Sequence, residues 1–273
     1  MRRFKSILCI LMLCAAPLTA AGSSPRYIAL ADSADNYIKA ENWDMAEKTI
    51  LTALRLEPGN FSNSLLLSNL GVVQTRRGNM EEALESFRLG LSIAPHSSVL
   101  YSNRARTYLH LGRYDDALAD INESIAIDSI QEWALQMRGF LLLNKDPEGA
   151  KRDFNKLLRT YPRNTLALTG LAAIAEKEGN NDEALRLYDK AIDIADDPDL
   201  RFSRILLKIN MEKYSAASED ISESLERFPQ EGELYLLRGY LHKLNFRNEE
   251  AAIDKKIALD KGADKQIVEQ FFP

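Results

Sequence analysis

The most constraining feature of this sequence is an alanine that recurs at an almost constant interval. Successive members lie 33 to 37 residues apart, and the seven positions are Ala46, Ala83, Ala117, Ala150, Ala184, Ala217 and Ala251. A period of about 34 residues is typical of stacked helical hairpins, because one hairpin cannot bury its apolar face alone and has to pack on a neighbour of the same kind. We therefore predict an all-α array of hairpins.

The residues around each alanine repeat as well. A proline, which ends a helix, stands twelve positions after four of the alanines: Pro58, Pro95, Pro162 and Pro229. A large apolar residue stands four positions after six of them, on the same helical face: Ile50, Phe87, Ile121, Phe154, Tyr188 and Ile221. A glycine five positions before three alanines marks the tight turn inside a hairpin: Gly78, Gly112 and Gly179.

With these residues the chain resembles the tetratricopeptide repeat (TPR) family. That family's small residue in the first helix is matched by Ala34, Gly71, Ala105, Gly139, Ala172 and Gly239, and Leu70-Gly71 matches its central dipeptide. The resemblance implies a right-handed superhelical α-solenoid of about seven TPR hairpins over residues 22–265, with a short capping helix over 266–273. The units are 27–60, 64–97, 98–131, 132–164, 165–197, 198–231 and 232–265. The pattern fails at Ile205, at Lys255 and in three extra residues before the second unit.

Arginine and aspartate occur together in four of the units. The candidate pairs, 15 or 16 residues apart, are Arg104 with Asp120, Arg138 with Asp153, Arg204 with Asp220, and Arg238 with Asp254. We predict bidentate ion pairs between the first and second helix of units three, four, six and seven. The alternative is a chance arrangement of charged residues on solvated faces.

The resemblance also indicates where a partner binds, because first helices line the concave groove of TPR arrays. The candidate groove residues are Leu65, Val72, Arg106, Leu109, Trp133, Gln136, Phe140, Leu143, Phe202 and Tyr240. Aromatic side chains bury a large area with few rotors, so Trp133 is the main candidate anchor. Phe140, Phe202 and Tyr240 have the alternative of packing between hairpins. Ser102-Asn103-Arg104-Ala105 is similar to part of the family's carboxylate clamp, but Trp133 and Met137 replace its lysine and arginine, so we reject a clamp.

Both ends of the chain differ from the repeats. Arg2, Arg3 and Lys5 precede an apolar stretch, and residues 1–21 together match a secretory signal peptide with cleavage expected after Ala21. This predicts export to the periplasm or cell envelope, with lipid attachment at Cys14 as the less favoured alternative. At the other end, residues 266–273 are expected to cap the last hairpin, and the alternative is a docking tail that joins two copies.

Composition and motifs exclude several classes of function. The net charge of −5 and the mixing of Lys and Arg with acids argue against nucleic acid as a partner. His96, His110 and His242 have no second ligand at metal spacing, and no phosphate loop or nucleophile motif is found, so we expect no cofactor and no enzyme activity. We expect a scaffold that binds a protein or peptide, without a membrane span. The alternatives are a structural subunit of an envelope assembly and an accessory regulator of an enzyme or transporter.

Overall fold

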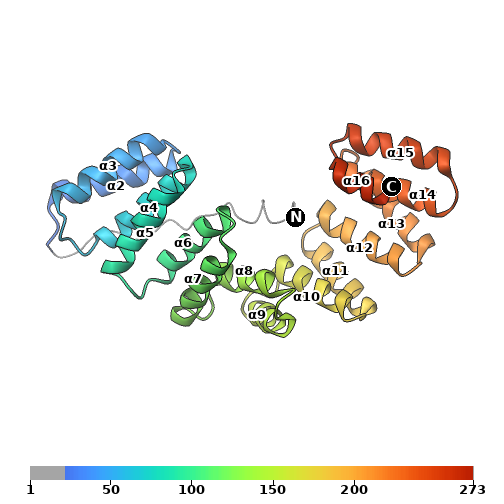
Figure 1. Cartoon of the computed structure of the whole chain (residues 1–273), viewed down its shortest axis with the longest axis horizontal. Coiled ribbons are helices and arrows are strands. Elements are labelled where there is room, and N and C mark those ends of the chain that lie inside the picture. The colour runs from blue at the N-terminus through green and yellow to red at the C-terminus, as the bar shows by residue number, and fades with distance from the viewer. Residues whose placement is uncertain (1–21, 273) are drawn as a thin grey trace. The chain divides into compact units, whose positions relative to one another are not determined.

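The computed structural model describes residues 22–272, and every regular element in that range is an α-helix (Figure 1). The predicted signal peptide therefore lies outside the described residues. The chain divides into two compact units, which we call the N-terminal unit (1–141) and the C-terminal unit (142–273). The all-α fold predicted from the alanine period is confirmed.

Helices pair into hairpins within each unit, and even numbers from α2 to α14 mark the first helix of each repeat, whereas α16 follows the last hairpin. The N-terminal unit contains α2 Pro25–Lys39, α3 Trp43–Leu56, α4 Asn63–Arg77, α5 Met80–Ile93, α6 Ser98–His110, α7 Tyr114–Ile127 and α8 Glu132–Leu142, whose last residue passes the boundary. The C-terminal unit contains α9 Pro147–Thr160, α10 Thr165–Lys177, α11 Asn181–Ile194, α12 Pro198–Asn210, α13 Tyr214–Arg227, α14 Gly232–Leu244, α15 Asn248–Asp260 and α16 Lys265–Phe271.

Local sequence signals explain where these helices begin and end. Asn42 and Asn164 precede α3 and α10, and each accepts a hydrogen bond from the backbone N–H three residues further on, at 3.2 and 2.8 Å. Pro147 and Pro198 occupy the first turns of α9 and α12, where a missing N–H costs nothing. The four repeat prolines each lie two residues beyond the end of a second helix, at α3, α5, α9 and α13.

The two helices of a hairpin approach closely where the repeat places a small residue. All seven repeat alanines are buried. In the N-terminal unit a Cβ added to Gly71 on α4 would lie 2.5 Å from the ring of Phe87 on α5. No real Cβ contact is that short, so glycine is required at this position for the aromatic ring to lie against the backbone of α4.

Each hairpin buries the rest of its apolar face on the next hairpin in the same unit. One core cluster in the N-terminal unit combines residues from α2, α3 and α4, among them Tyr27, Ile50 and Leu70. A cluster in the C-terminal unit combines α12, α13 and α14 in the same way. The core is therefore repeated along each unit instead of gathered at one centre.

The last hairpin has no following hairpin and is covered by α16. Val268 is fully buried and packs with Leu236, Ala258 and Ala263. The rings of Tyr240 and Phe271 meet edge to face with centroids 4.9 Å apart, and Lys243 Nζ donates to the Phe271 carbonyl at 3.3 Å. The structure therefore contains the expected capping helix.

The turn inside a hairpin requires one residue in the left-handed region. Gly78, Gly112 and Gly179 have φ of 86°, 71° and 76°. Glu41, Glu212 and Phe246 stand at the same place, five residues before their alanine, and have φ of 53°, 58° and 60°. A residue with a Cβ is strained there, and a bulky aromatic residue is unusual.

Phe246→Gly should therefore raise the free energy of unfolding by about 1 kcal/mol, since the left-handed conformation costs other residues roughly 1–2 kcal/mol. The Phe246 side chain is 90% exposed and has little packing to lose. The midpoint of urea unfolding measures the change. The reverse substitution Gly112→Phe, at the equivalent turn, should lower the midpoint, and a drop for Phe246→Gly would contradict the argument.

Candidate protein-interaction surface

In three of the four arginine–aspartate pairs, both residues belong to the same unit. In each of these pairs the guanidinium donates hydrogen bonds to both carboxylate oxygens. The Nε and Nη2 distances to the two oxygens are 2.7 and 2.7 Å for Arg104–Asp120, 2.9 and 2.5 Å for Arg204–Asp220, and 2.9 and 2.7 Å for Arg238–Asp254. Each pair joins the first helix of a hairpin to its second helix. Bidentate geometry fixes the rotation and the axial register of both helices.

The fourth pair joins residues that belong to different units, so it stays a prediction. Arg138 is on α8 of the N-terminal unit, and Asp153 is on α9 of the C-terminal unit. Within its own unit Arg138 Nη1 donates to Asn122 Oδ1 on α7 at 3.0 Å.

Burial makes these pairs more than surface contacts. The bonds to Asp120 raise the pKa of Arg104, while burial raises the pKa of Asp120 against the opposing effect of Arg104. The raised pKa of Asp120 shows that its carboxylate is shielded from bulk water. Such a pair depends on both members, because a single one would be a desolvated charge without a partner.

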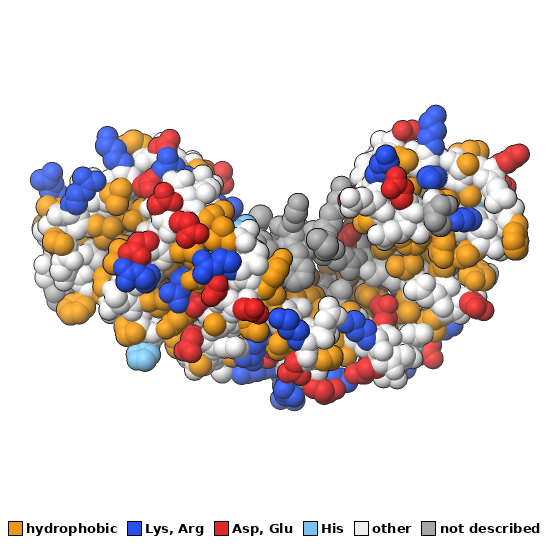
Figure 2. Space-filling view, viewed as in Figure 1, with side chains coloured by type: hydrophobic (Ala, Val, Ile, Leu, Met, Phe, Trp, Pro, Cys, Tyr) orange, Lys and Arg blue, Asp and Glu red, His pale blue; other side chains and the backbone are white. Residues whose placement is uncertain are grey.

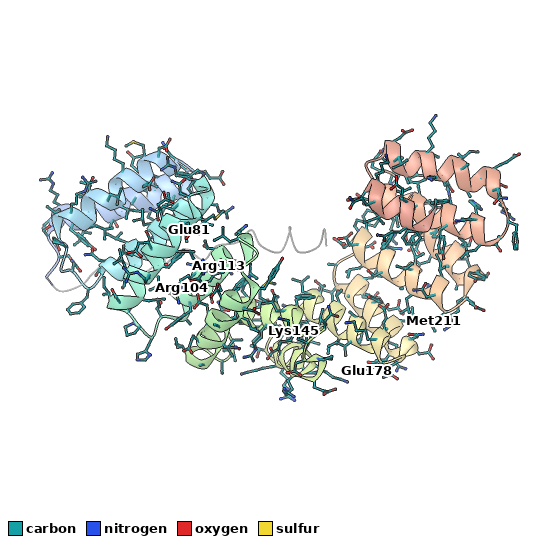
Figure 3. The ribbon with its side chains drawn as sticks, in the orientation of Figure 1. Glu81, Arg104, Arg113, Lys145, Glu178 and Met211 are labelled. Atoms are coloured by element: carbon teal, nitrogen blue, oxygen red, sulfur yellow. The ribbon has the colours of Figure 1, made fainter. Side chains whose placement is uncertain are left out.

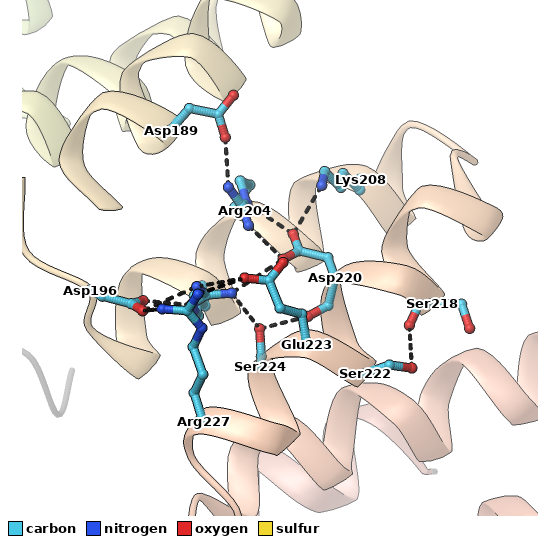
Figure 4. Close-up of polar contacts among 11 residues, drawn as sticks. Asp189, Asp196, Arg204, Lys208, Ser218, Asp220, Ser222, Glu223, Ser224 and Arg227 are labelled. Atoms are coloured by element: carbon cyan, nitrogen blue, oxygen red, sulfur yellow. Dashed lines mark hydrogen bonds and ion pairs between the residues drawn. The ribbon is translucent and has the colours of Figure 1, made fainter. Parts of the chain in front are cut away.

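The pair in the sixth hairpin is the centre of a polar network (Figure 4). Asp220, 4% exposed, also accepts from Lys208 Nζ at 3.0 Å. Arg204 Nη1 reaches Asp189 Oδ1 on α11 at 2.7 Å, so the network ties the fifth hairpin to the sixth. The sequence pattern identified the pair, whereas the contributions of Asp189 and Lys208 carry no repeating signal.

A second arginine of this network is buried and well satisfied. Arg201, on α12, is 3% exposed. Its Nε and Nη2 donate to Asp196 at 2.5 and 3.1 Å, and Nη2 also donates to Glu223 at 3.1 Å. The bonds to Asp196 are the largest cause of the raised pKa of Arg201. The buried guanidinium is thus paired with two carboxylates that are themselves exposed at the surface.

The predicted groove residues of the N-terminal unit are mostly buried. Leu65 is half-buried, and those under 10% exposed are Val72, Arg106, Leu109, Trp133 and Gln136. Trp133 was expected to stand open as an anchor, but it is only 7% exposed and the guanidinium of Arg106 lies over its ring, 4.1 Å from the centroid. Sequence placed both residues on inward positions of neighbouring first helices without indicating that they stack.

The predicted groove aromatics of the C-terminal unit are half-buried. Phe202 on α12 and Tyr240 on α14 pack against the core that contains Ile205 and Ile209 while keeping part of their surface open. They combine the two alternatives that the sequence left open. We call the half-buried side chains that cover this core from α12, α14 and α16 the C-terminal apolar patch: Phe202, Leu206, Tyr240, Leu244 and Phe271. Phe140 and Leu143 are also half-buried.

Elsewhere the surface mixes both charge signs. Lys and Arg side chains alternate with Asp and Glu over the visible face of both units (Figure 2). Glu81 lies in the first turn of α5 and Arg113 just before α7 (Figure 3), where Arg113 Nε donates to Asp116 at 2.8 Å. Across residues 22–272 there is no group of three metal-ligating side chains. Over the same residues, none of the helices combines the length and apolarity that crossing a membrane requires.

Asp220→Ala should lower the free energy of unfolding by about 3–5 kcal/mol, because it removes the buried carboxylate that half-buried Arg204 and Lys208 share. Chemical denaturation measures the loss. Glu85→Ala, which breaks the exposed pair with Arg88, should cost less than about 1 kcal/mol. Replacing Arg204 and Asp220 together by leucine should recover most of the loss, and a double variant as unstable as Asp220→Ala would contradict this account.

Comparisons with known proteins agree on the family. The tetratricopeptide repeat description matches residues 32–98, 99–130 and 141–209. A solved tetratricopeptide repeat protein from Parabacteroides merdae is 30% identical, with 91% of this chain and 98% of that chain covered and a TM-score of 0.72. YrrB, titled a TPR protein with an unusual peptide-binding site, is 20% identical, with 68% of this chain and 97% of that chain covered and a TM-score of 0.51.

Curated relatives are similar over a part of their length. Human RNA polymerase II-associated protein 3 is 28% identical over 48% of this chain and 19% of its own length. The chain thus spans about a fifth of that relative. The repeat pattern, the helical hairpins and the Parabacteroides structure together show that this chain belongs to the tetratricopeptide repeat family of protein-interaction repeats.

Proposed function

We propose that this protein is a non-enzymatic scaffold of the bacterial cell envelope that binds a protein or peptide through the first helices of its hairpins. The C-terminal apolar patch is the observation that carries the proposal. Its members lie on α12, α14 and α16, and each keeps part of its surface open to solvent.

The chemistry of the patch suits recognition of an apolar segment. Phe202 and Tyr240 are already held by the core behind them, so a partner that covers them immobilises few additional rotors. Large aromatic side chains with a fixed base are favoured hot spots of interfaces. Lys243, on the same helix as Tyr240, is half-buried and supplies a polar edge.

The family supports this choice of ligand class. YrrB is described by its title as having a peptide-binding site, and this chain shares its fold. A peptide or protein segment is therefore the ligand class that we assign to the first helices here.

A second candidate function uses other surfaces. Phe61, in the loop between α3 and α4, and Phe246, in the turn between α14 and α15, are 85% and 90% exposed. Neither belongs to the C-terminal apolar patch. Exposed aromatics at turns favour a structural subunit that contacts an assembly through its edges.

Capture by a photo-crosslinking amino acid distinguishes the two functions. Placed at Phe202, the crosslinker should capture one main partner in the native cell, and Tyr240→Glu should abolish that capture because a charge in the apolar patch has to be desolvated on binding. A crosslinker at Ser218, exposed on α13, is the matched control and should capture no partner.

Capture that survives Tyr240→Glu but is lost with Phe61→Ser or Phe246→Ser would favour the structural subunit instead. Circular dichroism of each variant shows whether the helices are intact. A single captured protein lost only through the patch supports the scaffold.

Export is a separate part of the proposal, and it rests on the charged and apolar pattern of residues 1–21. Protein recovered from the native cell should begin at Gly22, and it should fractionate with the periplasm or envelope. Sequencing its N-terminus measures the cleavage site. A chain that starts at Cys14 with a lipid would support the alternative anchor, and one that retains Met1 in the cytoplasm would contradict export.

A further inference from the structure

The N-terminal unit contains a stacked pair of polar groups that its other residues leave incomplete. Arg106 on α6 is 2% exposed, and its guanidinium carbon lies 4.1 Å from the centroid of the Trp133 ring on α8. The stack stabilises a cation through the face of the indole. It does not satisfy the N–H groups, which lie at the edges of both planar groups.

The hydrogen bonds of this pair are few. Arg106 Nη1 donates to Asn103 Oδ1 at a long 3.4 Å. Arg106 Nε and Trp133 Nε1 are buried and have no hydrogen-bond partner within residues 22–272. In the part of the chain that the structure describes, Arg106 has no ion pair with a carboxylate. The cluster therefore presents two unused donors and a positive charge.

The positive charge of Arg76 on α4 also acts on Arg106. Burial, the larger cause, and the charge of Arg76, the smaller one, together lower the pKa of Arg106 to about 9. The same Arg76 acts on His110, one turn after Arg106, whose pKa is lowered by burial and by that charge. At neutral pH Arg106 still carries its proton, so an anion that enters the cluster meets a full positive charge.

Arg201 in the C-terminal unit is a buried guanidinium that has counter-ions within the chain. Arg201 is as buried as Arg106, but Asp196 and Glu223 accept its N–H groups. Its pKa is raised, whereas that of Arg106 is lowered. A buried charge without a counter-ion is costly, and proteins seldom retain one without a use.

We propose that Arg106 and Trp133 form a subsite for the carboxylate of a Glu or Asp side chain on the bound partner. This inference rests on the proposed function, because the ligand is part of a protein or peptide. A carboxylate has two oxygens that accept hydrogen bonds, and the subsite offers two donors without acceptors.

An acidic side chain fits this chemistry better than a chain terminus. Its stem is made of CH₂ groups, which bring no further polar group that needs a partner in the subsite. A terminal residue also brings its own amide N–H, which would need an acceptor there. The partner's carboxylate would also be a counter-ion for Arg106, as Asp196 is for Arg201.

The first test is the thermal stability of the free protein. Arg106→Met keeps similar volume and removes the charge, so it should raise the melting temperature. Arg88→Met is the matched control, because Arg88 is exposed on α5 and pairs only with nearby Glu85; it should leave the melting temperature nearly unchanged. A lower melting temperature for Arg106→Met would show a purely structural stack and overturn the proposal.

The second test uses propionate as a small mimic of the glutamate side chain, with chloride at equal ionic strength as reference. Propionate should raise the melting temperature of the wild type and of Arg88→Met in a saturable manner, and Arg106→Met should not respond. Equal responses of the wild type and Arg106→Met would overturn the subsite.

The third test uses a partner captured by a crosslinker at Leu65, a half-buried predicted groove residue of the same unit as Arg106. Arg106→Met should weaken its affinity at least about tenfold, because a hydrogen bond to a charged group contributes roughly 1.5–3 kcal/mol. Changing one partner Glu or Asp to its amide should reproduce that loss, and amidating the partner's C-terminus should not. If the captured partner binds Arg106→Met with full affinity, the subsite is contradicted and the scaffold function is not. If propionate gives a saturable response but no partner is captured, the scaffold function is contradicted instead.

Discussion

The packing of a small residue against a large one between adjacent helices is the constraint on which the rest of the structure depends. Gly71 lets the Phe87 ring lie on the backbone of α4 within one hairpin, and Gly170 on α10 does the same for the Phe154 ring on α9 between two successive hairpins of the C-terminal unit. When the two helices of a hairpin pack closely, their remaining apolar side chains lie on the outer face of the hairpin. That face is buried by the next hairpin or, after the last hairpin, by α16.

The helices and their pairing could be predicted from sequence because the signals repeat. A recurring alanine, a proline twelve residues later and a glycine at the turn each report a local backbone requirement, and each recurs several times. The left-handed residue at Phe246 could not be predicted, because no glycine marks this turn. The hairpin imposes the left-handed conformation on whichever residue stands there.

The candidate site could be predicted only in position. Spacing identified Arg204 and Asp220 as partners, because residues on paired helices keep a fixed separation along the chain. Asp189 and Arg201 were missed because they occupy positions outside the repeating arginine–aspartate spacing. They join the network through side-chain contacts that no spacing indicates. Trp133 is buried and stacks with Arg106, which comes from another repeat unit, and no spacing in the sequence indicates that contact.

The buried arginines show how a repeat protein separates stability from recognition. Paired guanidinium and carboxylate groups at equivalent hairpin positions fix register, and both charges come from the chain, so they are satisfied before any partner binds. Arg106 departs from that arrangement: its position on the first helix offers it aromatic and amide neighbours instead of a carboxylate. A charge that the fold leaves uncompensated makes the free state less favourable and a complex with an anion more favourable. Selectivity for such a partner then follows from the same desolvation that weakens the free protein.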